Sequence, residues 1–259
     1  MNRLWSNGFR AVVASVMLAG CSTMDIVTRE RVSGPGYRPA NVYALPTGVP
    51  EKVRRVAVLP LVAESRGAQA EAGAEAMQSV LVSELVRSGV FEIFALSADE
   101  LRHATGRGQW TAEEKLPPAL LQRLRERHGC DAVLFSRLTQ YRAFPPLAVG
   151  WSFKLVECPA KVGETPRILW AADEVFDAGN PAVVNSARRY YLAQMKVSGP
   201  LSDSQAILHT PRGFAQYTLH ALALTLPLRE ISPQVPPPPA DVRSESKPKQ
   251  PAPVAGGSD

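Results

Sequence analysis

Hydrophobic positions in the first half of the chain predict a strand, a helix and a second strand in succession. Residues 53–62 (VRRVAVLPLV) combine β-branched side chains with a short apolar run, which is typical of a buried strand. In residues 70–87, apolar side chains recur at helical spacing: Met77, Val80, Leu81 and Leu85. Gly89 ends this helix, and residues 90–96 form the second strand. Because such units are almost always right-handed, we expect the two strands to be parallel in one sheet.

Two shorter helices are expected next. Ser97 and Glu100 have the spacing of a capping box, in which each side chain satisfies a free amide at a helix start. Pro117-Pro118 opens the second helix, which Gly129 closes. Three leucines of this second helix are expected to face the sheet: Leu120, Leu121 and Leu124.

The second half of the chain predicts three antiparallel strands and two helices. The strands cover residues 131–141, 148–157 and 167–176, with a turn at Pro145-Pro146 between the first two. Helices start at Asn180-Pro181 and at Thr210-Pro211, and the last helix is expected to bury Phe214, Tyr217, Ala221 and Leu224 before Pro227. The predicted fold class is therefore α/β. It comprises a mixed β-sheet with flanking helices, in which a βαβ unit precedes an antiparallel meander and C-terminal helices.

The amino terminus has the pattern of a secretion signal. Arg3 and Arg10 precede an apolar run at residues 11–18, and small residues follow before Cys21. The sequence Leu18-Ala19-Gly20-Cys21 resembles the lipobox of bacterial lipoproteins, in which the cysteine is acylated and becomes the first residue. This resemblance implies lipidation of Cys21, and a secreted protein with a free thiol is the alternative. Since Ser22 follows rather than Asp, we favour the periplasmic face of the outer membrane.

Segments rich in proline and glycine divide the chain. Residues 1–20 are interpreted as the lipoprotein signal peptide and residues 21–50 as a lipidated tether, because breakers recur there without helix or strand periodicity. Residues 51–230 form the predicted α/β domain. Residues 231–259, with four consecutive prolines at 236–239, are interpreted as a proline-rich disordered tail.

Composition and charge exclude several classes of function. The chain has 259 residues, of which 45% are hydrophobic and 20% charged, as expected of a globular domain with tails. The net charge of +5 includes Arg3 and Arg10 of the signal peptide, and no clustered basic face indicates nucleic-acid binding. No phosphate-binding glycine loop or Gly-x-Ser-x-Gly motif occurs, and the four histidines lack paired spacing. We therefore expect no enzymatic activity, no cofactor and no metal.

Three groups of residues are candidates for chemistry or contact. Cys130 and Cys158 flank the predicted hairpin, so they should face each other and could form a disulfide in an oxidising compartment, two buried thiols being the alternative. Asp173, Glu174 and Asp177 could supply the carboxylates of a cell-wall hydrolase, although neighbouring strand residues point to opposite faces. The third group is a basic and aromatic cluster that could contact a protein partner: Arg188, Arg189 and Tyr190.

Three short segments together resemble the CsgG-like superfamily, which includes curli assembly lipoproteins, a lipoprotein activator of peptidoglycan synthesis, flagellar lipoproteins and the amino-terminal domain of TolB. These segments are Val56-Ala57-Val58-Leu59-Pro60, Leu81-Val82-Ser83-Glu84-Leu85 and Gly129-Cys130-Asp131-Ala132-Val133-Leu134. The resemblance covers residues 53–141 best. It implies a non-catalytic α/β domain that binds a periplasmic or outer-membrane protein partner in cell-envelope assembly or regulation. The alternative is a homo-oligomeric secretion component of the curli type.

Overall fold

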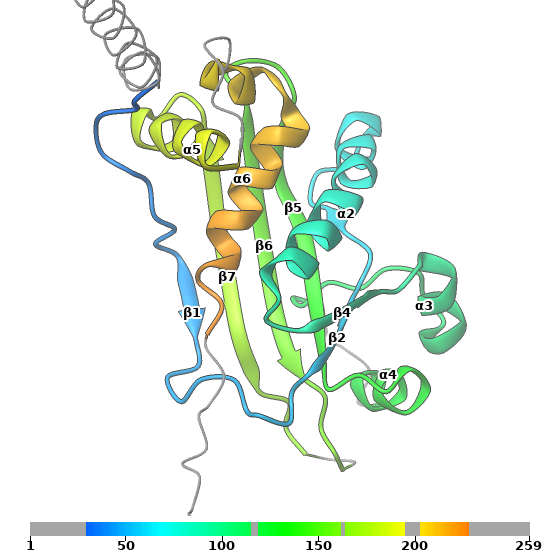
Figure 1. The fold of residues 1–259 in the computed structure, drawn as a ribbon. Helices are drawn as coiled ribbons and strands as arrows, with labels where there is room; N and C mark the ends of the chain where they lie inside the picture. Colours follow the sequence, from blue (N-terminus) through cyan, green and yellow to red (C-terminus); the bar gives the residue numbers. More distant parts are fainter. Residues whose placement is uncertain (1–29, 115–118, 162–163, 195–202, 228–259) are drawn as a thin grey trace, which may run out of the picture.

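A computed structural model describes residues 30–114, 119–161, 164–194 and 203–227, and its centre is one mixed sheet of seven strands (Figure 1). Six strands follow one another in the order β1-β7-β6-β5-β2-β4, and β3 pairs with β5. Helices flank this sheet, which confirms the predicted α/β class. Cys21 and residues 231–259 lie outside the described residues, as do the signal peptide and Pro117-Pro118.

The predicted βαβ unit is present and its strands are parallel. Strand β2 (Arg55–Val58) pairs with β4 (Glu92–Ala95), and helix α2 (Ala68–Ser88) connects them through β3 (Val62–Ala63). The single strand expected over residues 53–62 is divided in two at Pro60, which has no N–H to donate to a ladder. After this break, the backbone N–H of Leu61 donates to Gln78 Oε1 of α2 at 2.6 Å.

The antiparallel meander is also confirmed. Strands β5 (Ala132–Arg142), β6 (Ala148–Glu157) and β7 (Ile168–Asp177) pair in sequence order, and β5 joins them to the parallel half through β2. The helices α3 (Ala98–Thr105) and α4 (Leu120–His128) precede it, and α5 (Pro181–Gln194), a short 3-10 helix η1 (Ser204–His209) and α6 (Pro211–Ala223) follow. The capping box of α3 forms as predicted.

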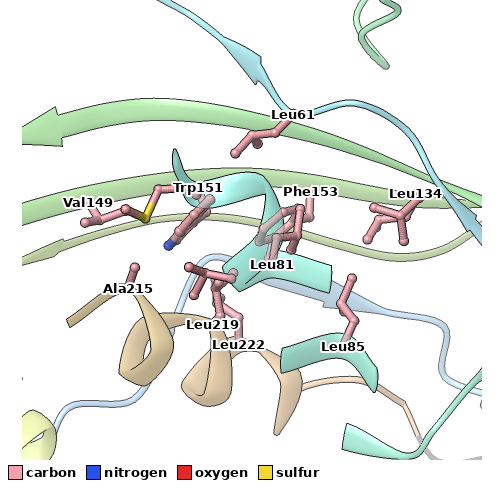
Figure 2. Packing of buried hydrophobic residues seen from close by; sticks show 14 of the residues in the cluster. Leu61, Leu81, Leu85, Leu134, Val149, Trp151, Phe153, Ala215, Leu219 and Leu222 are labelled. Carbon is pink, nitrogen blue, oxygen red and sulfur yellow. The ribbon is translucent and has the colours of Figure 1, made fainter. Parts of the chain in front are cut away.

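The two faces of the sheet carry separate cores because alternate side chains of each strand point to opposite faces. Helices α2 and α6 pack on the larger core, where Leu81, Leu219 and Leu222 lie near Trp151 and Phe153 (Figure 2). Leu85 of α2 lies nearer to Leu134. Helices α3 and α4 cover the smaller core on the other face. Its sheet residues are Ala57, Leu59, Val133, Phe135 and Val156.

Residues 30–50 correct the predicted boundary between tether and domain. Strand β1 (Val42–Ala44) pairs antiparallel with β7 and forms one edge of the sheet, and Val49 is fully buried. Strand β1 has three residues, which are too few to show an alternation of apolar and polar positions, and its partner β7 lies far along the chain. The folded domain therefore includes residues 30–50, rather than starting at residue 51.

Within the described residues, no helix combines the length and the apolar character needed to cross a bilayer.

Candidate functional site

Glu30, the first described residue, is fixed to the carboxyl-terminal helices. Its carboxylate accepts hydrogen bonds from Arg188 of α5 at 2.5 Å and from the hydroxyl and backbone N–H of Ser204 at 2.7 and 3.0 Å. The hydrogen bonds from Ser204, followed by the Arg188 guanidinium, lower the pKa of Glu30. Figure 1 shows that the chain enters the described fold beside α5. This contact fixes where a segment from Cys21 would reach the domain.

The residues after Glu30 also lie along α5. Arg189 donates to the carbonyl oxygens of Val32 and Gly34, and Asn185 donates to that of Pro35. Arg188 and Arg189, the candidate partner contacts, are thus engaged within the chain.

Tyr190 lies between helices rather than on an open surface. Its hydroxyl accepts from Arg87 of α2 at 3.2 Å, and its ring centroid lies 5.0 Å from that of His220 on α6. Burial raises the pKa of Tyr190. This side chain therefore joins α2, α5 and α6.

The three carboxylates near the end of β7 do not converge on a cleft. Glu174 accepts from the Tyr37 hydroxyl and from the backbone N–H groups of Ala40 and Asn41 at 2.9 and 3.0 Å. Asp177 binds Arg142 at 2.8 Å, whereas Asp173 is exposed. Glu174 thus holds the amino-terminal segment on the sheet edge, and the structure does not bring Asp173, Glu174 and Asp177 together at one site.

An open groove of about 910 Å³ lies at the carboxyl ends of β2 and β4. Its walls come from the segment between β2 and α2, the first turns of α2 and the start of α3. Ligands of open α/β sheets bind at this end of the parallel strands, where loops diverge to helices. The groove is therefore the best-placed candidate site on the described part of the chain.

The groove is acidic. Four glutamates and one arginine are its charged lining residues: Glu64, Arg66, Glu71, Glu75 and Glu100. Glu64 pairs with Arg137, and Glu100 is used in the α3 cap. Glu71 and Glu75 are exposed on successive turns of α2, and they are the lining carboxylates best placed to meet an outside group.

One border of the groove is a sheet edge without a neighbour among the described residues. Strand β4 ends the sheet order, and its N–H groups at Glu92 and Leu96 point to β2. Since backbone groups alternate along a strand, those of Ile93 and Ala95 are directed to the open side. An added strand could pair there.

The sequence pattern singled out neither Glu71 nor Glu75, and the groove was not predicted. Both side chains are exposed, and only the fold shows that α3 faces them across the groove. The available signal was positional. Residues that follow parallel strands meet at one sheet edge, so the segments after Val58 and Ala95 could have been paired.

The two cysteines lie together, as predicted. Their Sγ atoms are 3.8 Å apart, and both residues are buried free thiols. No group of three metal-ligating side chains with suitable geometry occurs in the described ranges.

Comparisons with known proteins assign no family. No protein-family model and no curated protein matches the sequence. The similar solved structures include lipoprotein GNA1162 from Neisseria meningitidis, with 18% identity over 55% of this chain and 99% of the other and a TM-score of 0.35. They also include the PelC dodecamer from Paraburkholderia phytofirmans, with 13% identity over 71% and 95% and a TM-score of 0.34. The hypothetical protein CT253 from Chlamydia trachomatis is 12% identical over 66% and 93%, with a TM-score of 0.36. These weak likenesses include a lipoprotein but identify no CsgG-like domain.

Proposed function

We propose that this protein is a non-catalytic lipoprotein of the bacterial outer membrane whose α/β domain binds a protein partner in cell-envelope assembly or regulation. The proposed anchor is acylated Cys21 in the sequence Leu18-Ala19-Gly20-Cys21. The observation that carries partner binding is the acidic groove beside the unpaired edge of β4.

The contacts of Glu30 with Arg188 and Ser204 limit the distance between the domain and the membrane. If Cys21 carries the lipid, only eight residues separate it from Glu30, and a chain of that length spans at most about 30 Å. The end of the domain that carries α5 and η1 then faces the bilayer. A tether this short holds the groove at a restricted height in the periplasm.

The groove favours a partner segment that is extended and basic. An added strand along β4 would satisfy the outward backbone groups of Ile93 and Ala95, which is the recognition mode of strand addition. Lysine or arginine side chains of that segment could reach Glu71 and Glu75. Because these carboxylates are exposed, their effect is expected mainly on association rate and partner choice.

Site-specific photocrosslinking in intact cells tests the proposal. A crosslinker at Gln109, which lines the groove, should give one main crosslinked product, between this protein and a different protein. The double substitution Glu71→Lys, Glu75→Lys should reduce its yield about tenfold through charge repulsion. The matched control is Glu126→Lys, an exposed position on α4 outside the groove, which should leave the yield unchanged.

The same experiment separates the alternative. A series of crosslinked homo-oligomers that ends at one large mass would contradict a one-to-one complex with another protein. It would favour the oligomeric secretion component. Equal yields from the charge-reversed and control proteins would remove the groove from the proposal. The anchor is tested separately by mass analysis of the amino-terminal peptide, which should carry acyl groups on Cys21.

A further inference from the structure

Cys130 lies just before β5 and Cys158 just after β6, so both are at the open end of the β5–β6 hairpin. Cys130 follows Gly129, the left-handed C-cap of α4, and Cys158 directly follows β6. The backbone N–H of Cys158 donates to the carbonyl of Asp131 at 2.8 Å, so the ladder continues past Ala132 and Glu157. The hairpin register therefore fixes the two cysteines beside each other.

The sulfur atoms already lie close to bonding geometry. They are 3.8 Å apart, and a disulfide needs about 2.05 Å. Closing this gap requires rotation of the two side chains. Cys130 and Cys158 are 0% and 1% exposed, and both belong to the smaller core.

Within the described residues, no contact of the two cysteines indicates another role for their thiols. The chain has three cysteines, and the third is Cys21. The described residues hold no metal-ligating group that includes the pair. The Arg125 guanidinium donates to the Cys158 carbonyl at 2.9 Å, which already connects α4 to the end of β6.

We propose that Cys130 and Cys158 form an intrachain disulfide in the exported protein and that this bond clamps α4 and the β5–β6 hairpin together. The proposal rests on the export assumed in the proposed function and is independent of partner binding. Of the two helices on the smaller core, only α3 contributes to the acidic groove, whereas α4, which the bond would hold, does not line it.

The oxidation requires a disulfide donor, here a thiol–disulfide oxidoreductase or oxidised glutathione. In the incompletely folded chain both thiols are accessible, and the thiolate of one cysteine, for example Cys130, makes the first attack. Its sulfur attacks the donor disulfide, forms a mixed disulfide and releases one donor thiol. Cys158 loses its proton and attacks the Cys130 sulfur, which releases the second donor thiol. Two electrons and two protons pass to the donor, and burial of both sulfurs places this step before the smaller core closes.

Thiol counting on the full-length exported protein tests the bond. The protein is trapped in acid, unfolded without reductant and alkylated with a maleimide–polyethylene glycol probe that adds a fixed mass per thiol. We expect no added probe before reduction and two probes after it, since acylation blocks the sulfur of Cys21. Two probes before reduction, in protein whose Cys21 is processed, would overturn the proposal.

Refolding separates failure of export from failure of the bond. If Cys21 is unprocessed and the protein stays inside the cell, the proposed function fails, and residues 22–259 are refolded with oxidised glutathione instead. Formation of the intrachain bond supports the geometry, and persistent free thiols contradict it. The refolded oxidised form should melt about 5–10 °C above the reduced form, because the bond closes a loop from 130 to 158 in the unfolded chain. A Cys130→Ala, Cys158→Ala protein should melt with the reduced form under both conditions.

Discussion

At the scale of single residues, Glu30 shows how one carboxylate sets where the folded domain starts. Replacement of Glu30 by Gln should destabilise the protein by about 1 kcal/mol at neutral pH, because charge-assisted bonds to Arg188 and Ser204 are lost. The folded state lowers the pKa of Glu30, so its contribution is present above the unfolded value of 4.5 and is lost as pH falls through the lower folded value. Urea unfolding at several pH values measures this. The difference between wild type and E30Q should shrink in acid, and a constant difference would contradict the assignment.

Ionisation of Glu84 changes the stability of the fold in the opposite direction to that of Glu30. Its side chain is 2% exposed, Oε1 has no hydrogen bond although Arg87 lies 3.1 Å away, and burial raises its pKa. The folded state therefore binds the proton more tightly than the unfolded state, and the carboxylate is destabilising at neutral pH. Glu84→Gln should raise stability by about 1 kcal/mol at pH 7, and the gain should disappear as pH falls below the raised value. Glu75→Gln on the exposed side of α2 is the control and should change little. A loss of stability in E84Q at pH 7 would show that the ion pair outweighs desolvation.

At the scale of elements, α6 separates what a pattern predicts from what packing selects. The sequence indicated a helix from Pro211 with Leu224 on its apolar stripe, but Leu224 is 74% exposed. The helix ends at Ala223, and Leu222 is buried in its place against the sheet. The helix itself follows from local signals, whereas its last turn is set by contact with α2 and β6.

A matched pair of alanine substitutions tests this reading of α6. Leu222→Ala should cost about 3 kcal/mol, because it opens a cavity in the larger core. Leu224→Ala should change the free energy of unfolding by less than about 0.5 kcal/mol, as expected of an exposed side chain. Chemical denaturation measures both. Equal losses would mean that Leu224 is covered in solution, for instance by another protein.

At the scale of the whole molecule, the amino-terminal segment is part of the sheet and of the helical layer. Deletion of residues 22–29 should leave the unfolding midpoint unchanged, because the deletion stops before Glu30. Deletion of residues 22–50 removes β1, the Glu174 contacts and buried Val49, and should lower the midpoint strongly. Thermal unfolding of the two proteins gives the comparison. If both deletions behave alike, residues 30–50 contribute nothing to the stability of the domain.

Local patterns in the sequence determined most of the elements. Helical spacing predicted α2, the Ser97 and Glu100 pair predicted the start of α3, and strand periodicity predicted the meander of β5, β6 and β7. These features depend on residues a few positions apart, so their physical causes are visible in the chain itself. The adjacency of Cys130 and Cys158 followed in the same way, from the symmetry of one hairpin.

Only the tertiary structure decided the features that join distant residues. Strand β1 pairs with β7, Glu30 meets Arg188, and Glu71 faces α3 across the groove. None of these has a local period, because each depends on where folding brings a second segment. The arginines at 188 and 189 illustrate the reason. Their charge suggested an external partner, whereas the chain's own amino-terminal segment fills that place once the sheet has formed.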